Sequence, residues 1–327
     1  MISFFQQKRI LVTGASGYLA TNLINAVKDI DCTIIRLSRA GQLLPLEAKA
    51  ETKDIAGDIC LRQTWVEALE GVDIVYHFAA QTSVYIAEDD ALADLNANVV
   101  PMLTLLEVCR EKEYKPAILF SGTVTQAGVP QDLPVNESCV DNPITIYDTH
   151  KLIAENYLKY YCQNKFVSGA VLRLANVYGP GPKSSSSDRG VINMMMRKAI
   201  AGEELTVYGK GDCLRDYVYI DDVVSAFLKA AECIEKTNGN HYIIGSGEGN
   251  TVADAIDLIA DTVTSRTGRA VSVKHIEPPK PQSPIEDRNF VADITKFSQS
   301  TGWQPGHSLA EGIDKTLKSI LKTYQNS

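Results

Sequence analysis

Short apolar runs alternate with helical patterns along the first 175 residues of the chain. Apolar runs of strand length occur at 9–13, 32–37, 73–78, 117–120 and 168–174. Between them, apolar residues recur every three or four positions, which predicts helices at 21–30, 65–69, 91–109 and 146–161. Apolar strands that alternate with helices indicate a parallel sheet covered on both faces. The pattern therefore predicts an α/β fold with a doubly wound parallel sheet.

Gly14, Gly17 and Ala20 follow the first predicted strand and open the first predicted helix, with the spacing GxxGxxA. Glycines let the backbone turn tightly and approach a pyrophosphate, which rests on the N-terminal end of the helix. A small residue such as Ala20 still allows the helix to pack closely on the sheet. In this strand–turn–helix context the pattern predicts a Rossmann-type NAD(P)-binding domain, which we place at residues 1–178.

The pattern changes after Gly179. Prolines and serines at 180–187 predict a loop, and the proline-rich segment 278–284 predicts a second one. The elements between them are shorter than those of the first domain. We therefore expect residues 179–327 to form a smaller α/β region that binds the substrate, with the chain passing between the two parts near their boundary.

The composition of the 327-residue chain is that of a globular protein, with 45% apolar and 22% charged residues. Seven cysteines without a CxxC pair predict reduced thiols, a cytoplasmic location and no metal site. A net charge of −8 argues against general nucleic-acid binding, although an anionic small molecule needs only a locally basic pocket. No apolar run approaches the roughly 18 residues of a membrane span, and no signal-peptide pattern is evident at the start. We therefore expect no nucleic-acid or membrane partner.

The end of the second predicted strand bears on which dinucleotide binds. A carboxylate about 20 residues beyond the glycines would hold the ribose 2′-hydroxyl of NAD, but this place reads Leu37, Ser38 and Arg39. The Arg39 guanidinium can pair with a 2′-phosphate instead, so we expect NADP(H), with NAD as the alternative. Asp58, which follows Gly57, either accepts from the adenine amino group or caps a helix.

Tyr147 and Lys151 form a YxxxK pattern at the head of a predicted helix. Residues four apart share one helix face, so the phenol and the ammonium point into the same site. The cation should make the phenol more acidic, so that Tyr147 can exchange a proton near neutral pH. The polar end of an apolar strand, at 120–125, supplies hydroxyl groups that can hydrogen-bond the reacting oxygen of a substrate.

Nine segments occur in the order expected for one enzyme superfamily. They are Gly14–Ala20, Tyr76–Ala80, Asn98–Val99, Phe120–Thr125, Tyr147–Lys151, Arg173–Pro180, Leu205–Gly209, Arg215–Asp222 and Gly302–Pro305. Through these motifs the chain resembles the extended short-chain dehydrogenase/reductase superfamily, in particular its nucleotide-sugar epimerases, dehydratases and ketoreductases. The motifs are specific for the superfamily and much less specific for the substrate.

The resemblance implies a role for each matching residue. Tyr147 would be the general acid/base, Lys151 its partner and a ligand of the nicotinamide ribose, and Thr123 would replace the family's catalytic serine. Together with the residues discussed above, the resemblance places the cofactor against Gly14, Ser16, Gly17, Tyr18, Leu19, Ser38, Arg39, Asp58, Ile59, Ala79, Ala80, Asn98, Ser121, Tyr147 and Lys151. It implies that the nucleotide sugar contacts Thr125, Asn176, Arg215 and Arg288, with the two guanidinium groups on the diphosphate.

Departures from the family pattern argue against two reactions. Family 4,6-dehydratases carry an Asp-Glu pair directly after the strand-end Thr, for acid/base removal of water, whereas this chain has Val124 and Thr125. Relatives that resemble GDP-fucose synthase place Cys and His near the sugar, where this chain has Thr125 and Gly181. His150 stands where serine is common, and we expect it in surface or interface packing rather than in catalysis.

Three functions remain open. The leading hypothesis is an oxidoreductase that acts at C4 of a nucleotide-diphosphate sugar, as a 4-keto sugar reductase that uses NADPH. The second is a nucleotide-sugar 4-epimerase with tightly bound NAD, and the third is a dinucleotide-binding regulatory protein without turnover. The resemblance also implies a homodimer, whose interface would pair the helix near Leu103 with the helix after Tyr147, through Ala154, Tyr157 and Tyr161.

Overall fold

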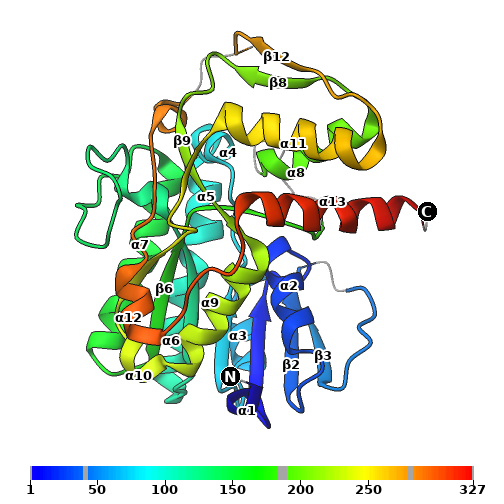
Figure 1. Ribbon diagram of the computed structural model, residues 1–327. Coiled ribbons are helices and arrows are strands. Elements are labelled where there is room, and N and C mark those ends of the chain that lie inside the picture. The colour runs from blue at the N-terminus through cyan, green and yellow to red at the C-terminus, as the bar shows by residue number, and fades with distance from the viewer. Residues whose placement is uncertain (1, 40–42, 183–189, 279–282, 326–327) are drawn as a thin grey trace.

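A sheet of seven parallel strands forms the centre of the molecule (Figure 1). The computed structural model describes residues 2–39, 43–182, 190–278 and 283–325. In spatial order the strands are β10 (His241–Ile244), β6 (Ser168–Leu174), β5 (Ala117–Thr123), β4 (Ile74–His77), β1 (Arg9–Thr13), β2 (Thr33–Ser38) and β3 (Glu51–Ala56). The chain starts in the middle with β1, adds β2 and β3 on one side, and then adds β4, β5 and β6 on the other. This order confirms the predicted doubly wound sheet.

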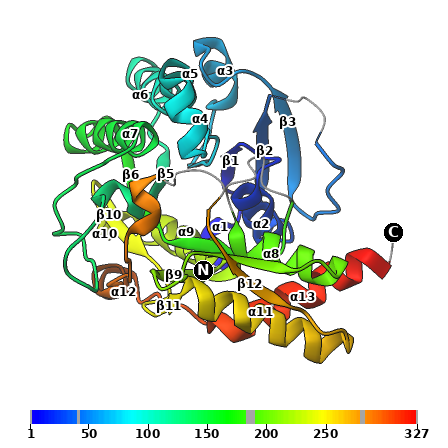
Figure 2. The same ribbon diagram turned by 90° about the horizontal axis from the view of Figure 1, so that it is seen from above.

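Successive residues of β1 point to opposite faces of the sheet, so both faces are apolar. Ile10 and Val12 belong to the core on one face, and Leu11 belongs to the core on the other. Helices cover both faces (Figure 2), with α3 (Arg62–Ala68), α6 (Val100–Lys112) and α7 (Ile146–Gln163) on the Leu11 face and α2 (Tyr18–Val27) and α9 (Ile220–Glu232) on the opposite face. Burial on both faces explains why the central strands read as continuous apolar runs.

The predicted helix at 91–109 is two helices in the structure. α5 (Ala91–Asn98) ends before α6 begins at Val100, and Pro101 lies in the first turn of α6. Proline lacks the N–H that a helix interior needs, but a first turn accepts it. The break leaves Asn98 at the end of α5, where its side chain donates to the carbonyl of Gln81 in the loop after β4.

The stretch Ala91–Lys112, which holds α5 and α6, is long and apolar enough by length and composition to cross a membrane, with a mean hydropathy of 1.3. Half of its apolar 18-residue segment is buried inside the fold. Buried core helices pass the same test, so the stretch is weak evidence for a membrane span.

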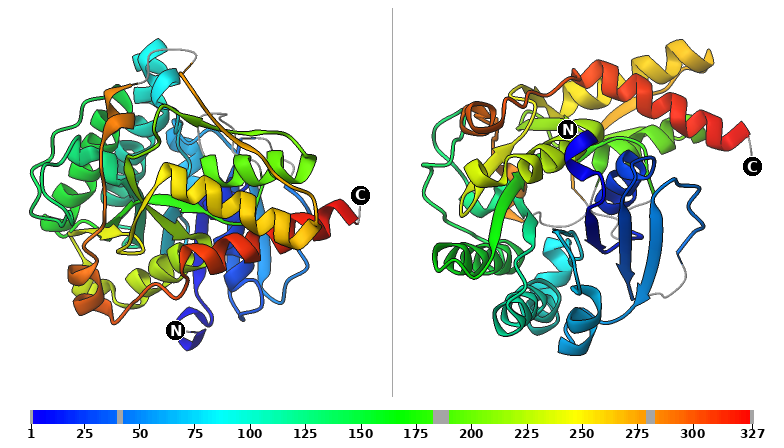
Figure 3. Two further views of the ribbon diagram at one scale, coloured as in Figure 1. Left: turned by 45° about the horizontal axis from the view of Figure 1, so that its top comes forward. Right: turned by 90° about the horizontal axis from the view of Figure 1, so that it is seen from below.

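The second part of the chain adds two small sheets and several helices beyond one end of the large sheet (Figures 1 and 3). One small sheet contains β11 (Gly249–Thr251), β9 (Leu214–Tyr219) and β7 (Asn176–Tyr178), and the other contains β12 (Val273–Ile276) and β8 (Leu205–Tyr208). The further helices of the second part are α8 (Val191–Ala201), α10 (Ile234–Thr237), α11 (Val252–Thr267), η2 (Pro284–Asp287), α12 (Thr295–Thr301) and α13 (Leu309–Gln325). The first part also contains α1 (Ile2–Phe5), α4 (Val84–Asp89) and η1 (Val124–Ala127). Much of the two predicted loops, namely 183–187 and 279–282, lies outside the described residues.

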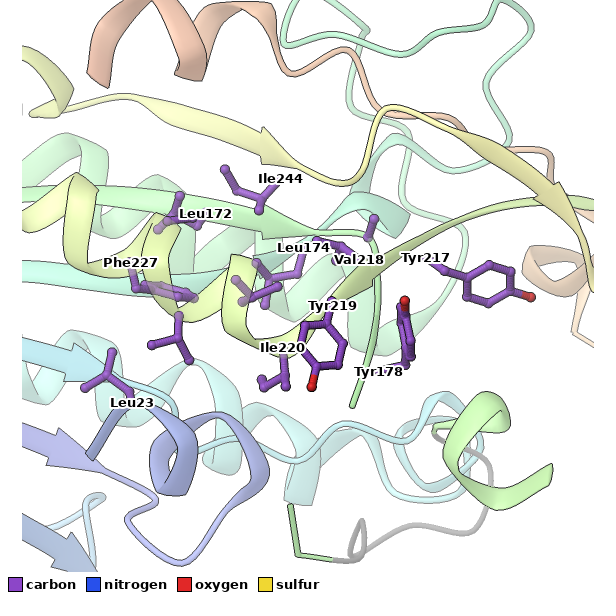
Figure 4. Close-up of a cluster of buried hydrophobic side chains, with 14 of the residues drawn as sticks. Leu23, Leu172, Leu174, Tyr178, Tyr217, Val218, Tyr219, Ile220, Phe227 and Ile244 are labelled. Carbon is purple, nitrogen blue, oxygen red and sulfur yellow. The ribbon is translucent and has the colours of Figure 1, made fainter. Parts of the chain in front are cut away.

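The two parts of the chain share one apolar core. Leu23 of α2 packs near Ile220 and Phe227 of α9, and Tyr178 and Tyr219 extend the same cluster into the second part (Figure 4). β10 also comes from the second part of the chain, yet it pairs with β6 in the large sheet. This shared packing fixes the second part relative to the carboxyl ends of the central strands.

Candidate active site

Residues that the sequence assigns to the cofactor and to catalysis converge at the carboxyl ends of β1, β4 and β5. These strands are neighbours: the last residue of β1, Thr13, pairs with the last residue of β4, His77, and His77 pairs with Phe120, three residues before the end of β5. The turn after β1, the loop after β4 and the end of β5 therefore meet along one edge. Open α/β sheets bind their ligands at this edge.

The turn at Gly14–Gly17 has no room for larger side chains. Gly14 has a φ of +64°, and a Cβ there would lie 2.9 Å from the Cα of Ala79. A Cβ on Gly17 would lie 2.9 Å from the carbonyl oxygen of Gly14. Gly17 starts α2 without a side-chain hydrogen bond, so the first N–H groups of this helix can donate to an anion. These features fit the pyrophosphate of a dinucleotide, and Ser16, Tyr18 and Leu19 lie in this turn and in the first residues of α2.

Thr13 holds the loop after β4 against the glycine turn. Its hydroxyl oxygen accepts from the backbone N–H groups of Phe78 and Ala79, each at 3.1 Å, and lies 2.9 Å from Nδ1 of His77. Burial, together with the charge of Lys151, lowers the pKa of His77 to about 3. His77 is therefore a neutral core residue that supports the loop carrying Ala79 and Ala80.

The end of β2 carries the residues predicted to select the dinucleotide. The carbonyl of Leu37 accepts from the N–H of Ala15 at 3.2 Å, which places this strand end beside the glycine turn. Ser38 is buried, and its Oγ has no hydrogen-bond partner among the described residues. Arg39 is exposed next to it. Both side chains are available to a ribose hydroxyl or to a phosphate.

Asp58 and Ile59 form a turn after β3. The Asp58 carboxylate accepts from the N–H of Cys60 at 2.9 Å, whereas the N-cap of α3 is Leu61. The alternative prediction that Asp58 caps this helix is therefore wrong, because the N-cap lies three residues later. The carbonyl of Ile59 accepts from Nε1 of Trp65 at 2.6 Å and fixes the turn.

Asn98 and His150 meet at the buried carboxylate of Asp94. Asn98 Nδ2 donates to Asp94 Oδ1 at 2.9 Å, and His150 Nδ1 lies 2.7 Å from Asp94 Oδ2. The Oδ1 atom of Asn98 is buried and has no hydrogen-bond partner within the described ranges, so it is available to a bound cofactor. The expectation that His150 lies at the surface is wrong, because its side chain is buried against Asp94.

Tyr147 and Lys151 lie in the first turns of α7, and both side chains are buried. The helix starts at Thr145, whose hydroxyl accepts from the N–H of Asp148 at 3.1 Å. Tyr147 and Lys151 are one turn apart and share a face of the helix. The structure thus presents the phenol and the ammonium of the YxxxK pattern together.

The ammonium group of Lys151 lies in an apolar setting. Its Nζ lies 4.0 Å from the centroid of the Phe120 ring on β5. Burial lowers the pKa of Lys151 to about 7, although the negative charges of Asp94 and Glu155 oppose this effect. The site therefore contains a lysine that gains or loses its proton close to neutral pH.

A chain of hydroxyl groups runs from the end of β5 to α7. Thr123 Oγ1 lies 2.7 Å from Thr125 Oγ1 and accepts from the N–H of Thr125 at 3.3 Å. Thr125 Oγ1 in turn donates to Oδ1 of Asp148, and Thr145 Oγ1 donates to Oδ2 at 2.7 Å. Sequence reasoning misses Asp148. The sequence signal that could have identified Asp148 is the Thr-x-x-Asp capping pattern at 145–148, which overlaps the YxxxK pattern.

A second chain of side chains supports the backbone of Thr123. The N–H of Thr123 donates to Oε1 of Gln126 at 3.0 Å, and Gln126 Nε2 donates to Glu155 at 2.9 Å. Arg173 on β6 binds Glu155 through Nε and Nη2, at 2.9 and 2.7 Å, and it also binds Asp141. Burial alone would raise the pKa of Glu155, but the hydrogen bonds and charge of Arg173 lower it to about 2. The end of β5, which also carries Ser121, is therefore rigidly held.

Arg215 and Arg288, which the resemblance assigns to a diphosphate, lie together. Arg215 on β9 donates from Nη2 to the carbonyl of Glu286 at 2.5 Å and from Nη1 to the carbonyl of Arg288. Arg288 donates from Nη1 to the carbonyl of Ile285 at 2.7 Å. Both side chains are buried. Each guanidinium group thus uses part of its donors to fix the backbone around η2.

Asn176 lies near this pair of arginines. It opens β7 and pairs with Tyr217, two residues along β9 from Arg215. Burial raises the pKa of Tyr217 to about 12, against the effect of the positive charges of the two arginines. Asp216, on the same strand, accepts from the N–H of Ala292 at 3.0 Å and holds the segment after η2 against β9.

The site is assembled from phenol, ammonium and hydroxyl groups. Tyr147, Lys151 and Thr123 are suited to moving a proton to or from an alcohol oxygen beside a bound dinucleotide. In the parts of the chain that the structure describes, no group of three or more His, Cys, Asp or Glu side chains is arranged to hold a metal ion.

Comparison with known proteins finds similarity to UDP-glucose 4-epimerases over nearly the whole chain. The chain is 29% identical over 324 residues to the UDP-glucose 4-epimerase of Mycolicibacterium smegmatis, covering 97% of this chain and 100% of that relative. The crystal structure of UDP-glucose 4-epimerase with UDP-glucose from Thermotoga maritima has a TM-score of 0.86 and 29% identity, over 97% and 99% of the two chains. The UDP-glucose 4-epimerase of Thermus thermophilus, in complex with NAD, has a TM-score of 0.80 and 25% identity, over 96% and 99%.

A family model described as the NAD dependent epimerase/dehydratase family matches residues 10–245. The matched region contains the glycine turn, the hydroxyl-bearing end of β5 and the YxxxK pattern. The predicted membership of the extended short-chain dehydrogenase/reductase enzymes is thereby confirmed. The chain belongs to the NAD dependent epimerase/dehydratase family.

Proposed function

We propose that the protein is a nucleotide-sugar 4-epimerase, which interconverts the two configurations at C4 of a UDP-sugar with NAD as a recycled cofactor. The observation that carries the proposal is the strand end beside Tyr147. There Val124 and Thr125 stand where a 4,6-dehydratase has an acid/base pair, and Thr123 and Thr125 supply hydroxyl groups. The relatives named UDP-glucose 4-epimerases support this alternative better than the NADPH-dependent reductase that the sequence favours.

In this proposal Tyr147 carries the proton chemistry. Its phenol oxygen takes the proton of the C4 hydroxyl and later returns it. A bound nicotinamide would supply the hydride chemistry at C4, as acceptor from one face of the sugar and donor to the other. Lys151, whose pKa is about 7 in the buried setting, stabilises the deprotonated phenol in its charged form. Thr123 lines the reacting oxygen from the β5 side.

Arg215, Arg288 and Asn176 are the proposed ligands of the substrate diphosphate. A guanidinium group has five N–H donors, and backbone carbonyls occupy some of those of Arg215 and Arg288. The remaining donors can bind phosphate oxygens in a fixed fork. Thr125 was expected to contact the sugar, and its hydroxyl is already shared between Thr123 and Asp148.

The proposed cofactor site uses the glycine turn, the N-terminus of α2 and the buried polar atoms of Ser38 and Asn98. One observation keeps a second candidate function open. The end of β2 offers the exposed cation of Arg39 and the apolar Leu37 in place of a carboxylate. This end suits a 2′-phosphate, and a 4-keto sugar reductase that uses NADPH is the corresponding alternative.

One experiment separates the two functions. The protein as purified is denatured, any released dinucleotide is identified, and a second sample is incubated with UDP-galactose alone. Stoichiometric NAD and the appearance of UDP-glucose are the results expected for the epimerase. A protein that is empty as purified, prefers NADPH to NADH and leaves UDP-galactose unchanged would contradict the epimerase and favour the reductase.

The outer face of α7 is the proposed interface of a homodimer. Ile153, Asn156, Tyr157 and Tyr160 line a shallow hollow on this helix, and Tyr160 is 57% exposed. Ala154 is fully buried in its own chain, so it is not part of the free face. Light scattering of the wild type and of Tyr160→Glu tests the proposal, because a buried charge should shift a dimer toward monomers.

A further inference from the structure

Asp94 is a buried carboxylate on α5 that the proposed reaction does not use. It is 1% exposed. Its Oδ1 atom accepts from Nε2 of Gln81 at 2.7 Å and from Nδ2 of Asn98 at 2.9 Å. Its Oδ2 atom lies 2.7 Å from Nδ1 of His150 on α7. Burying a carboxylate costs free energy unless it is hydrogen-bonded, so these contacts explain how the fold tolerates Asp94, but not what its charge is for.

The partners of Asp94 leave its negative charge without a permanent counter-ion. Gln81 and Asn98 donate from neutral amides, and His150 is charged only when it is protonated. Among the described residues, no lysine or arginine forms an ion pair with Asp94. Asp94 therefore brings a net negative charge into the interior whenever His150 is neutral.

Lys151 is a buried cation beside this carboxylate. It follows His150 in α7, it is 2% exposed, and its Nζ lies 4.0 Å from the centroid of the Phe120 ring. In the described part of the chain, no carboxylate forms an ion pair with this ammonium group. Burial favours the neutral amine, and the negative charges of Asp94 and Glu155 oppose that effect. Charges that act over a distance therefore help to keep Lys151 protonated.

The two carboxylates that act on Lys151 differ in their own surroundings. Glu155 Oε1 lies 2.7 Å from Nη2 of Arg173 and 2.5 Å from Nζ of Lys159. Two cations thus offset the charge of Glu155, and opposite charges that lie together nearly cancel at a distance. Asp94 has two amides and one imidazole in the same places. We therefore expect Asp94 to supply most of the negative field at Lys151.

Other ionisable groups near Lys151 do not replace Asp94. His77 on β4 is neutral near pH 7, because burial and the charge of Lys151 lower its pKa to about 3. Asp148 on α7 accepts from the hydroxyl groups of Thr125 and Thr145. Its charge is not among those that raise the pKa of Lys151.

We propose that Asp94 is a positioning residue, whose buried charge acts on Lys151 and keeps its ammonium group protonated beside Tyr147. The inference rests on the proposed function, in which the Lys151 cation stabilises the deprotonated phenol. In this arrangement Gln81, Asn98 and His150 hold the carboxylate in place without neutralising it. The site thus keeps a cation that burial alone would discharge.

Asp94→Asn removes the charge and can keep all three contacts. The amide oxygen of the new side chain accepts from Gln81 and Asn98, and its N–H group donates to Nδ1 of His150 in the other tautomer. Lysine labelled with ¹³C at Cε reports the charge of its ammonium group by NMR, and Lys151→Met identifies the signal of Lys151. In the cofactor-free wild type the titration midpoint should lie at about 7. In Asp94→Asn it should fall by about one pH unit, and equal midpoints would overturn the proposal.

Asp90→Asn is the matched control. Asp90 is exposed at the start of the same helix, where its carboxylate accepts from the N–H of Ala93 at 2.9 Å. Asparagine caps a helix as well as aspartate does, so this variant removes one negative charge from α5 without changing the fold. Water and salt screen an exposed charge, and the midpoint of Lys151 should stay at its wild-type value. A shift as large as that of Asp94→Asn would overturn the special role of the buried carboxylate.

Steady-state kinetics tests the link to Tyr147. A midpoint that falls from about 7 to about 6 lowers the charged share of Lys151 at pH 7 about fivefold. The kcat for UDP-galactose should fall by up to about that factor, with a nearly unchanged KM. A lowered midpoint with an unchanged kcat would overturn the link to the phenol. A wild-type protein that does not interconvert UDP-galactose and UDP-glucose would contradict the proposed function, and the titration of Lys151 would still decide whether Asp94 holds its charge.

Discussion

The two groups of candidate residues are held in place in different ways. In the catalytic group (Thr123, Tyr147 and Lys151), the supporting bonds join side chains of η1, α7 and β6 to one another and to the backbone of β5. In the arginine group (Asn176, Arg215 and Arg288), the supporting bonds join guanidinium groups to backbone carbonyls around η2. The first group is fixed by the rigid centre of the fold, and the second group fixes its own surroundings.

This difference leads us to expect different contributions to the reaction. Side chains that are locked between strands and a helix hold reacting atoms in one geometry, which lowers the barrier. Arginines beside a backbone segment are suited to binding a charged ligand in the ground state. Changes in the catalytic group should therefore act on kcat, and changes in the arginine group should act on KM.

Tyr147→Phe should have the largest effect on turnover. The variant keeps the ring but loses the proton carrier, so kcat should fall roughly 10³-fold to 10⁴-fold. The bound dinucleotide should be retained, because the glycine turn and Asn98 are untouched. Turnover of UDP-galactose and the dinucleotide content after denaturation are the two measurements. Substantial activity in Tyr147→Phe would remove the phenol from its role and would leave the catalytic group without its proton carrier.

Arg173→Met should have the largest effect on stability. It removes the guanidinium group that binds the buried Glu155 and the nearby Asp141, so that Lys159 is the cation that stays on Glu155, and breaking a buried pair costs about 3–4 kcal/mol. Arg215→Met should cost about 1–2 kcal/mol, because its hydrogen-bond partners are neutral carbonyls and its ionic partner Glu286, at 4.0 Å, is exposed to solvent. Urea unfolding of the two variants measures both losses. Equal losses would break the distinction between the two groups.

The sheet and the position of the catalytic group could be predicted from the sequence because their signals are local. Five apolar runs with helices between them fix a parallel sheet, and the ends of neighbouring strands then lie together. The spacing of Tyr147 and Lys151 fixes their shared helix face. The break between α5 and α6 could also be anticipated, because Pro101 cannot lie inside a helix.

The supporting side chains could not be predicted in the same way. Asp148 contacts Thr125, which is 23 residues away, and His150 contacts Asp94, which is 56 residues away. Partners at such separations follow from tertiary packing, and no periodicity in the sequence encodes them. The preference for NADPH rests on Arg39, an exposed residue whose role depends on a ligand rather than on the fold.

Arg215→Met should also sharpen the difference in kinetics. The loss of charged hydrogen bonds to a diphosphate should raise the KM for UDP-galactose about tenfold to a hundredfold, while kcat stays within about threefold. Steady-state kinetics measures both constants. Arg269→Met, which removes an exposed arginine, is the control for a general loss of charge. A fall in kcat without a change in KM would place Arg215 with the catalytic group.

Lys151→Met should change the free energy of unfolding by an amount that depends on pH. In the cofactor-free protein, burial lowers the pKa of Lys151 to about 7, from 10.5 for an ordinary lysine. Between these two values the unfolded chain binds one more proton than the folded chain. The free energy of unfolding should therefore rise with pH, by up to about 1.4 kcal/mol per pH unit from this group. Lys151→Met lacks this contribution.

The stability advantage of Lys151→Met over the wild type should therefore shrink as the pH rises from 7 to 9. Urea unfolding of both proteins at three pH values in this range measures the difference, in which the titration of other groups cancels. Parallel curves would mean that Lys151 keeps an ordinary pKa in the fold. Converging curves would mean that the catalytic group holds its cation against the cost of burial. Arg215→Met should show no such change with pH in its effect on the free energy of unfolding, since a guanidinium group stays charged at every pH tested.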